Sequence, residues 1–351
     1  MTNTTASPAL LDRPIRLTLE RWGLLAIAVV GLGLVVLLPM VMDLFGLLQI
    51  TVYIIFALLA VSLGFVLGFG GILCLGQAAF FGIGAYAYAI AAFNMEGTTV
   101  PFLIALAAPA LFAAIVGYFI FYGRITDVYV GVITITVTLI LFSLVNSTAG
   151  PEYAIGNAQL GGYNGIPALP MLEWPFQTGN PLAPEDLFRL CLLALLGAYF
   201  GLRLLLASKF GRLVVAVREN ERRAELLGYD IRLIKLVTFV IGAAIAGFAG
   251  ILHANWGSFV GPNVFSVIQS AQVLIWVMVG GTGTLLGPIV GCFMLMWFTN
   301  SLGGQQVINS SLVLGATLLV FVMALPAGLL PTLRRLGNRV LPVLLQKETD
   351  A

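Results

Sequence analysis

The sequence predicts an all-α polytopic membrane protein with about ten hydrophobic segments. Of its 351 residues, 60% are hydrophobic and only 9% are charged, whereas about 25% of the residues in a soluble domain are charged. Two long stretches, residues 44–95 and 236–333, contain no Asp, Glu, Lys or Arg. The alternation of apolar and polar residues over about ten positions that is typical of membrane β-strands is absent. These observations exclude an ordinary soluble enzyme.

The apolar windows follow one another along the chain, and a helical span needs about 20 such residues. They centre on residues 24–42, 46–68, 72–93, 101–122, 128–147, 187–206, 236–256, 266–281, 285–301 and 308–330. The first window, from Leu24 to Met42, exceeds the roughly 7–15 residues of a signal-peptide core, and no small-residue cleavage site follows it. We therefore expect it to be retained as the first helix.

The windows at 266–281 and 285–301 are short, and the segment Gly280-Gly281-Thr282-Gly283-Thr284 divides them. They predict either two full spans or one broken or re-entrant pair. Irregular backbone is tolerated at membrane depth only where it is buried in protein or lines a cavity. We therefore expect these glycines to lie inside the bundle or beside a cavity.

The distribution of charge predicts the orientation, because Lys and Arg collect in short cytoplasmic loops. Residues 203–235 hold eight basic side chains, and both tails, 1–23 and 332–351, are also basic. The loop 150–186 instead holds four acidic residues and no basic one. We expect both termini and the loop 207–235 in the cytoplasm and the loop 150–186 outside, an arrangement that ten crossings satisfy.

Catalytic residues are scarce. The chain has a single histidine, His253, and lacks the HExxH, GxSxG and GxxxxGK[ST] patterns. Its three cysteines, Cys74, Cys191 and Cys292, stand in apolar segments and predict small buried side chains rather than a metal site. No carboxylate lies deep in a predicted span, which argues against a proton-driven carrier or a voltage sensor. A sodium-coupled carrier, which can use carbonyls and hydroxyls alone, stays open.

A glycine-rich stretch at residues 69–86 is the first candidate functional segment, because glycines let helices approach closely. Gln77 is a polar side chain within it and shares a helix face with Gly84, seven positions on. Two interpretations stay open: close helix packing with Gln77 as an interhelical hydrogen bonder, or the lining of a path for a polar solute. The candidate residues are Gly71, Gly76, Gln77, Gly82, Gly84, Tyr86, Gly280, Gly281 and Gly283.

A charged stretch at residues 214–228 is the second candidate. It predicts a short helix that ends at Gly228, with Leu213, Val217, Ala224 and Leu227 on one side. Such a helix either lies on anionic lipid or docks a cytosolic protein, and the composition does not separate the two. The candidate contact residues are Arg218, Glu219, Glu221, Arg222, Arg223, Ala224 and Gly228.

The order of these motifs resembles that of inner-membrane permeases of branched-chain amino acid ABC importers. The resemblance begins with Gly70-Gly71-x4-Gly76-Gln77-Ala78-Ala79-Phe80-Phe81-Gly82-x-Gly84-Ala85-Tyr86 and continues through Ala216–Asn220, Leu227–Asp230, Gly242–Gly250 and Trp276–Gly291, so it covers about residues 45–330. Cys74 and Gln77 stand where the family usually has serine and histidine. Of the family's docking pattern Glu-Ala-Ala-x-x-x-Gly, only Ala224 and Gly228 match.

The resemblance implies one transmembrane permease domain over residues 1–351, in a bacterial inner membrane. It implies a second related permease subunit, two cytosolic ATPases that dock at 207–235, and a periplasmic solute-binding protein, with ATP hydrolysed on the partners and no cofactor in this chain. The implied cargo is a branched-chain amino acid, although similar permeases carry urea or short amides. A path without buried charge suits such net-neutral or zwitterionic solutes. A membrane enzyme is the least supported alternative.

Overall fold

The computed structural model describes residues 13–125, 127–150, 152–174 and 179–303, together with positions 315, 328, 329 and 332. The chain is mostly helical, and within this described part six helices are long and apolar enough to cross a membrane. They cover Leu24–Val41, Leu44–Phe69, Thr99–Tyr122, Val128–Ser147, Pro184–Ala207 and Ile231–Gly257. These ranges coincide with six of the ten predicted windows, so the multi-pass helical class is confirmed, whereas the count of ten is not.

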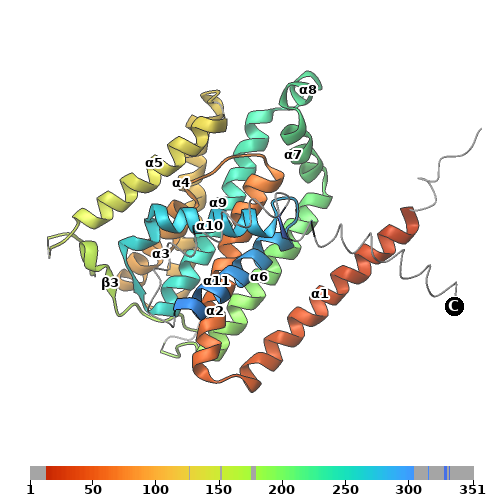
Figure 1. The fold of residues 1–351 in the computed structure, drawn as a ribbon. Helices are drawn as coiled ribbons and strands as arrows, with labels where there is room; N and C mark the ends of the chain where they lie inside the picture. Colours follow the sequence, from red (N-terminus) through yellow and green to blue (C-terminus); the bar gives the residue numbers. More distant parts are fainter. Residues whose placement is uncertain are drawn as a thin grey trace, which may run out of the picture.

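Two helices form the centre of the bundle, α2 (Leu44–Leu63) and α9 (Ile231–Gly257). They are the most buried of the six, and α9 packs along α2, α3 (Gln77–Asn94) and α4 (Thr99–Tyr122) (Figure 1). The close approach of α9 to its neighbours depends on small residues, as expected where lipid offers no hydrophobic drive for helix association. The predicted glycine-rich segment therefore lies at the core of the fold.

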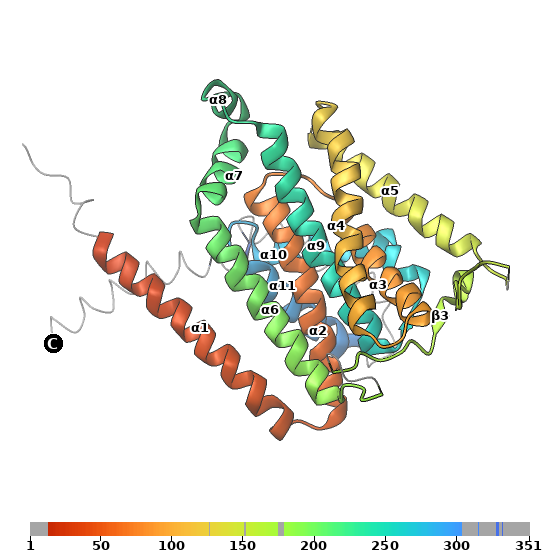
Figure 2. The same ribbon diagram turned by 180° about the vertical axis from the view of Figure 1, so that it is seen from behind.

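Two other helices lie at the edges. α1 (Arg13–Val41) runs along α6 (Pro184–Ala207) at one edge, and α5 (Asp127–Ser147) stands at the opposite edge (Figures 1 and 2). The large apolar side chains that α1 and α5 leave exposed include Val29, Leu37 and Ile140. Such side chains are as stable in hydrocarbon as in a protein core, so these faces suit contact with lipid.

Two predicted windows are interrupted by irregular backbone. α2 continues into a π-helix, η2 (Gly64–Phe69), residues 70–76 are not helical, and α3 begins only at Gln77. Gln77 is therefore the first residue of a helix instead of lying within one. Further on, α10 (Val267–Gly280) and α11 (Leu286–Gly303) are separated by non-helical residues 281–285, and neither is among the six candidate spans. Most of the window 308–330, together with residues 1–12 and 333–351, lies outside the described residues.

The other short helices and strands lie at the two ends of the bundle. α7 (Lys209–Glu219) and α8 (Glu221–Leu226) form a hairpin at one end (Figure 1); we call this the hairpin end. The opposite end, the loop end, carries the remaining short elements: β1 (Ala154–Ile155), β2 (Ala158–Gln159), the 3-10 helix η3 (Gly162–Asn164), β3 (Ile166–Pro167), β4 (Phe259–Val260) and the 3-10 helix η4 (Pro262–Phe265).

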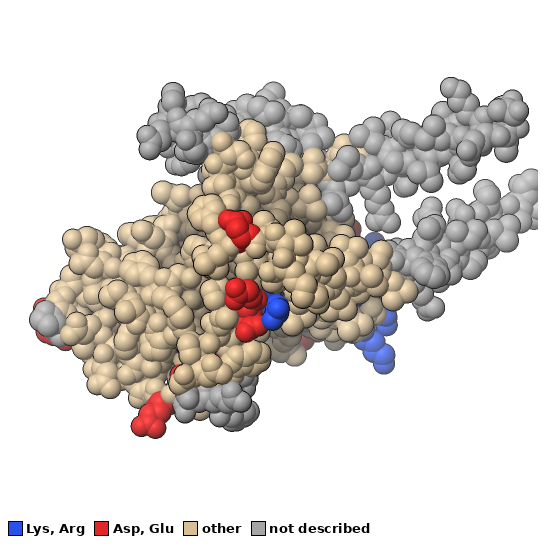
Figure 3. Space-filling model, turned by 90° about the horizontal axis from the view of Figure 1, so that it is seen from below, with Lys and Arg blue, Asp and Glu red and all other residues tan. Residues whose placement is uncertain are grey.

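The segment at the loop end is held in place by hydrogen bonds and strand pairing. β1 pairs antiparallel with β2, and β3 pairs antiparallel with β4, which follows α9. The Leu172 amide donates to Asn255 Oδ1 at 2.8 Å, and the Tyr88 hydroxyl donates to the Pro170 carbonyl at 3.0 Å. Figure 3 views the molecule from this end, where a few Asp and Glu side chains, together with some Lys or Arg side chains, stand out from a mostly uncharged surface.

Candidate functional site

The α7–α8 hairpin is two helices where the sequence predicts one. Asn220 adopts extended backbone (φ −161°, ψ 98°) and its side-chain oxygen accepts a hydrogen bond from the Arg223 amide at 2.9 Å. Asn220 thus ends α7 and caps the N-terminus of α8. At the other end of α8, Gly228 has φ +85° and the Tyr229 amide donates to the Ala224 carbonyl. This is a glycine C-cap, and it confirms that the helix ends at Gly228.

The inner face of the hairpin is a small hydrophobic cluster of its own. It consists of Val214, Val217, Ala224 and Ile234, with Phe210, Leu213 and Ile231 packed against them. Ala224 is only 4% exposed, so its methyl group faces α9 and is turned away from any partner. The expected seam also included Leu227, but that side chain is 71% exposed. Ala224 thus lies in the apolar seam as expected, and the break at Asn220, which rotates α8 relative to α7, explains why Leu227 does not.

The outer face of the hairpin is apolar at its tip. Leu226 is 83% exposed, and Leu227 and Tyr229 stand beside it in the sequence with exposed side chains. The charged candidates around them are exposed as well, namely Arg218, Glu219, Glu221, Arg222 and Arg223. Exposed leucines at the tip of a charged hairpin can contact another protein or the membrane surface.

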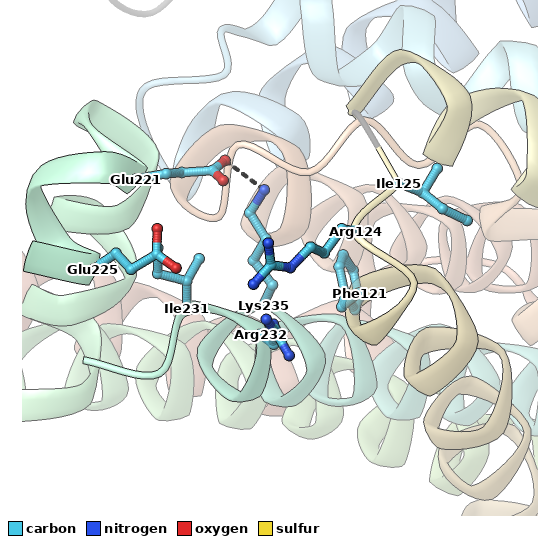
Figure 4. Close-up of a pocket in the computed structure, with 8 residues that line it drawn as sticks. All are labelled: Phe121, Arg124, Ile125, Glu221, Glu225, Ile231, Arg232 and Lys235. Atoms are coloured by element: carbon cyan, nitrogen blue, oxygen red, sulfur yellow. Dashed lines mark ion pairs between the residues drawn. The ribbon is translucent and has the colours of Figure 1, made fainter. Parts of the chain in front are cut away.

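An ion pair connects α8 to the helical bundle (Figure 4). Lys235 Nζ of α9 lies 2.5 Å from Glu221 Oε1 of α8. The pair borders a cavity of about 350 Å³ between the end of α4, α8 and the start of α9, into which Arg124 and Arg232 also project. The Arg232 guanidinium lies over the Tyr122 ring, 5.8 Å from its centroid. α8 is thus attached to α9, and the start of α9 is in turn attached to the end of α4.

Arg218 joins the two segments that the sequence singled out separately. Its Nη1 donates a hydrogen bond to the Gly68 carbonyl in the π-helix at the end of α2. Its aliphatic stem covers Gly71, where an added Cβ would lie 2.9 Å from Arg218 Cγ. Gly71 also has φ +68°, a backbone conformation that glycine adopts without steric cost. The hairpin therefore contacts the glycine-rich segment directly, through Arg218.

Gln77 is 1% exposed and its amide is fully engaged. Nε2 donates to Ser62 Oγ of α2 at 2.8 Å and to the Gly242 carbonyl of α9 at 3.4 Å. Oε1 accepts from Cys74 Sγ at 3.4 Å. The side chain joins the start of α3 to both central helices, which is the geometry of the packing interpretation.

The remaining candidate glycines also mark close contacts. An added Cβ would strike the Thr134 carbonyl at Gly76, the Phe265 ring at Gly82, the Gly247 carbonyl at Gly84 and the Gly287 carbonyl at Gly280. Tyr86 stacks on Phe265 with ring centroids 5.4 Å apart. Gly281 differs in having φ +108°, which ends α10, and Gly283 has open space around it. Most of these glycines are therefore needed for helix packing.

A bundle of apolar spanning helices packed through glycines, with a charged hairpin fastened to one end, is the architecture of a multi-pass membrane permease. Residues 46–323 match the family described as the permease component of branched-chain amino acid transport systems, and the chain belongs to this family of ABC transporter permeases. The match confirms the resemblance found in the motifs and covers nearly the same residues.

Individual relatives agree with this assignment. The chain is 30% identical to the high-affinity branched-chain amino acid transport system permease protein LivM of Escherichia coli (strain K12), over 81% of this chain and 69% of that protein. It is 26% identical to the permease protein LivH of the same strain, over 35% of this chain and 40% of that protein. It is 29% identical to the autoinducer 2 import system permease protein LsrC of Photorhabdus laumondii, over 28% of this chain and 31% of that protein. No solved structure matches.

Proposed function

We propose that this chain is one membrane subunit of an ATP-driven importer that passes branched-chain amino acids across a bacterial inner membrane. The observation that carries the proposal is the α7–α8 hairpin, which offers exposed leucines at its tip and is bonded to the bundle through Arg218 and Lys235. A surface of this kind can receive a motion from a partner and pass it to spanning helices.

The partners follow from the family and from the two ends of the bundle. Because the chain is similar both to LivM and to LivH, a second, related permease subunit completes the path. Two cytosolic ATPases hydrolyse ATP and dock at the hairpin end, within residues 207–235. A periplasmic solute-binding protein delivers the cargo at the loop end, where residues 150–186 lie. This orientation puts both termini in the cytoplasm.

The mechanism is a coupled movement of rigid helices. When the ATPases close on ATP, the hairpin moves with them, and the hydrogen bond from Arg218 to Gly68 draws the end of α2 in the same direction. The Glu221–Lys235 pair carries the start of α9 along. ATP binding then biases the bundle between its outward-facing and inward-facing arrangements without any chemistry in this chain.

A net-neutral cargo is supported by the buried side chains. Among the described residues, the buried polar side chains are Thr51, Ser62, Gln77, Thr98, Thr134, Thr138, Thr238, Asn255 and Ser270, all of them uncharged. A solute with a net charge would have no buried counter-charge there, which is costly. Urea, short amides and, by similarity to LsrC, autoinducer 2 also fit this condition. Competition of each with radiolabelled leucine uptake separates them.

The docking surface is tested by a double variant, Leu226→Ala with Leu227→Ala. Leu103→Ala is the control, because Leu103 is also an exposed leucine but lies near the start of α4, at the loop end. We expect the double variant to weaken copurification of the ATPase at least about tenfold, as for a pair of interface anchors, and the control to leave it unchanged. Full copurification of the ATPase with the double variant would place the interface elsewhere. Uptake by vesicles that hold this chain alone, driven by sodium, would instead favour a secondary carrier.

A further inference from the structure

A cavity of about 640 Å³ opens beside the central helix α2, toward the loop end. Its walls come from the first half of α2, the last turn of α9, the start of α10 and the end of α11. Along α2 it extends from Phe45 to Phe56, about 16 Å at the rise of an α-helix. The cavity therefore reaches from the loop end well into the bundle.

Four amide side chains line this cavity: Gln49, Gln269, Gln272 and Asn300. Asp, Glu, Lys, Arg and His are missing from its described lining. Amides facing hydrocarbon would be costly, so such a cluster indicates a wall that meets water, protein or a polar solute. The Gln49 amide donates to the Tyr53 hydroxyl at 2.8 Å. Gln269 Nε2 is buried without a hydrogen-bond partner among the described residues, so this donor lacks an acceptor.

Most of the remaining lining is apolar, with several aromatic rings beside Leu48, Val52 and Met296. The rings of Phe56 and Trp276 lie 5.5 Å apart, and Trp256 is held in place by a hydrogen bond from its indole nitrogen to the Leu48 carbonyl at 3.0 Å. Flat apolar surfaces of this kind match an aliphatic side chain. The cavity thus combines uncharged groups that both donate and accept hydrogen bonds with an apolar floor.

We propose that this cavity is a cargo-binding subsite for a zwitterionic amino acid with an aliphatic side chain; the inference rests on the importer function proposed above. The Gln269 side chain turns toward the cavity and its Nε2 donates to the cargo's carboxylate. The ammonium group of the cargo donates to the side-chain oxygens of Gln272 and Asn300, and the aliphatic side chain of the cargo lies on Phe56 and Trp276. Because the solute is neutral overall, amides suffice and no fixed ion is needed. A charged amino acid would leave its second charge unpaired there.

The first experiment tests whether water-soluble molecules can enter the cavity, with the variant Asn300→Cys in the assembled transporter. Asn300 is exposed at the cavity wall, whereas the three native cysteines are buried, so labelling of the variant stands out from the background. A water-soluble, membrane-impermeant thiol reagent applied from the periplasmic side should label it. Failure to label would mean that lipid or the second permease fills the cavity, and would overturn the proposal.

Binding is tested by leucine uptake in proteoliposomes that contain both permeases, the ATPases and the binding protein. Gln269→Leu removes one hydrogen bond to cargo and should lower uptake about threefold to tenfold, while Gln269→Asn, which keeps the amide, should restore part of it. Thr136→Leu is the control, an exposed polar side chain in the middle of α5 and outside the cavity, and should transport normally.

Equal uptake by Gln269→Leu and the parent protein would overturn the subsite and leave the importer function standing. Absence of leucine uptake by the parent complex would overturn the importer function itself. Copurification of the ATPases with Gln269→Leu serves as the folding check. If Gln269→Leu failed to assemble, normal uptake by Gln272→Leu, a second variant of the same wall, would overturn the proposal, and a threefold to tenfold loss would support it.

Discussion

Gly84→Ala should destabilise the bundle, because Gly84 is where α3 and α9 touch backbone to backbone. An added Cβ would overlap the Gly247 carbonyl oxygen and lie 2.7 Å from the Gly247 Cα and carbonyl carbon. Backbone atoms in the middle of two packed helices cannot turn aside as a flexible side chain can, so the helices must separate. Overfilling a packed core typically costs about 1–3 kcal/mol.

The same substitution also has a favourable term, since alanine is a better helix former than glycine by about 1 kcal/mol. Gly197→Ala is the matched control for this term: Gly197 lies inside α6 and has nothing within 4 Å of its added Cβ. The difference between the two variants isolates the packing cost, which we expect to be about 1–3 kcal/mol. The assay is thermal unfolding in detergent, followed by helical circular dichroism. A melting temperature of Gly84→Ala equal to or above that of Gly197→Ala would refute the reasoning.

Four further variants test other parts of the structure. Asn157→Cys, on the exposed strand turn of the loop end, should label in permeabilised cells with an impermeant thiol reagent, and labelling only after inner-membrane lysis would reverse the topology. Arg218→Ala loses its bond to Gly68 and should lower leucine uptake about tenfold while the ATPase still copurifies; unchanged uptake would rule out this link. Gln77→Leu should lower stability by about 1 kcal/mol in the same unfolding assay; an unchanged melting temperature would show that its hydrogen bonds add nothing. Ala224→Trp should make the hairpin sensitive to limited proteolysis, because Ala224 is enclosed; an intact, protected hairpin would contradict that burial.

The spanning helices could be predicted from sequence because each is long and apolar, so the signal is local and is not altered by what the helix packs against. The break between α7 and α8 at Asn220 could not be predicted from sequence, because the residues around Asn220 are good helix formers. Its extended backbone conformation depends on how α8 packs against α9. The burial of Ala224, which packs with Ile234 of α9, does agree with the apolar seam that the sequence predicts. A sequence interpretation based on one continuous helix necessarily put Leu227 on the wrong side.

The partners of Gln77 were beyond prediction for a related reason. Its hydrogen bonds go to residues 15 and 165 positions away, and no local pattern encodes such pairs. The cavity amides, by contrast, left a signal that the sequence interpretation passed over: Gln49, Gln269, Gln272 and Asn300 are amides inside the charge-free stretches 44–95 and 236–333. Hydropathy averaged over a window hides a single amide side chain. Each such amide is nevertheless informative, because placing a polar side chain in the membrane costs free energy.

One helix connects the proposed docking surface with the proposed cargo cavity. α2 carries Gln49 and Phe56 in the cavity wall, and its π-helical extension carries Gly68, which receives the Arg218 hydrogen bond. Gly68 and Gln49 are about 28 Å apart along such a helix, and α2 is buried over most of that length. A displacement of the hairpin therefore has three possible consequences: the whole of α2 moves with the cavity wall, α2 bends between the two sites, or the hydrogen bond to Gly68 breaks. The π-helix η2 lies at the end of α2 that receives the hydrogen bond from Arg218. Because helices often bend at π-helical turns, η2 is where we expect α2 to bend when the hairpin moves.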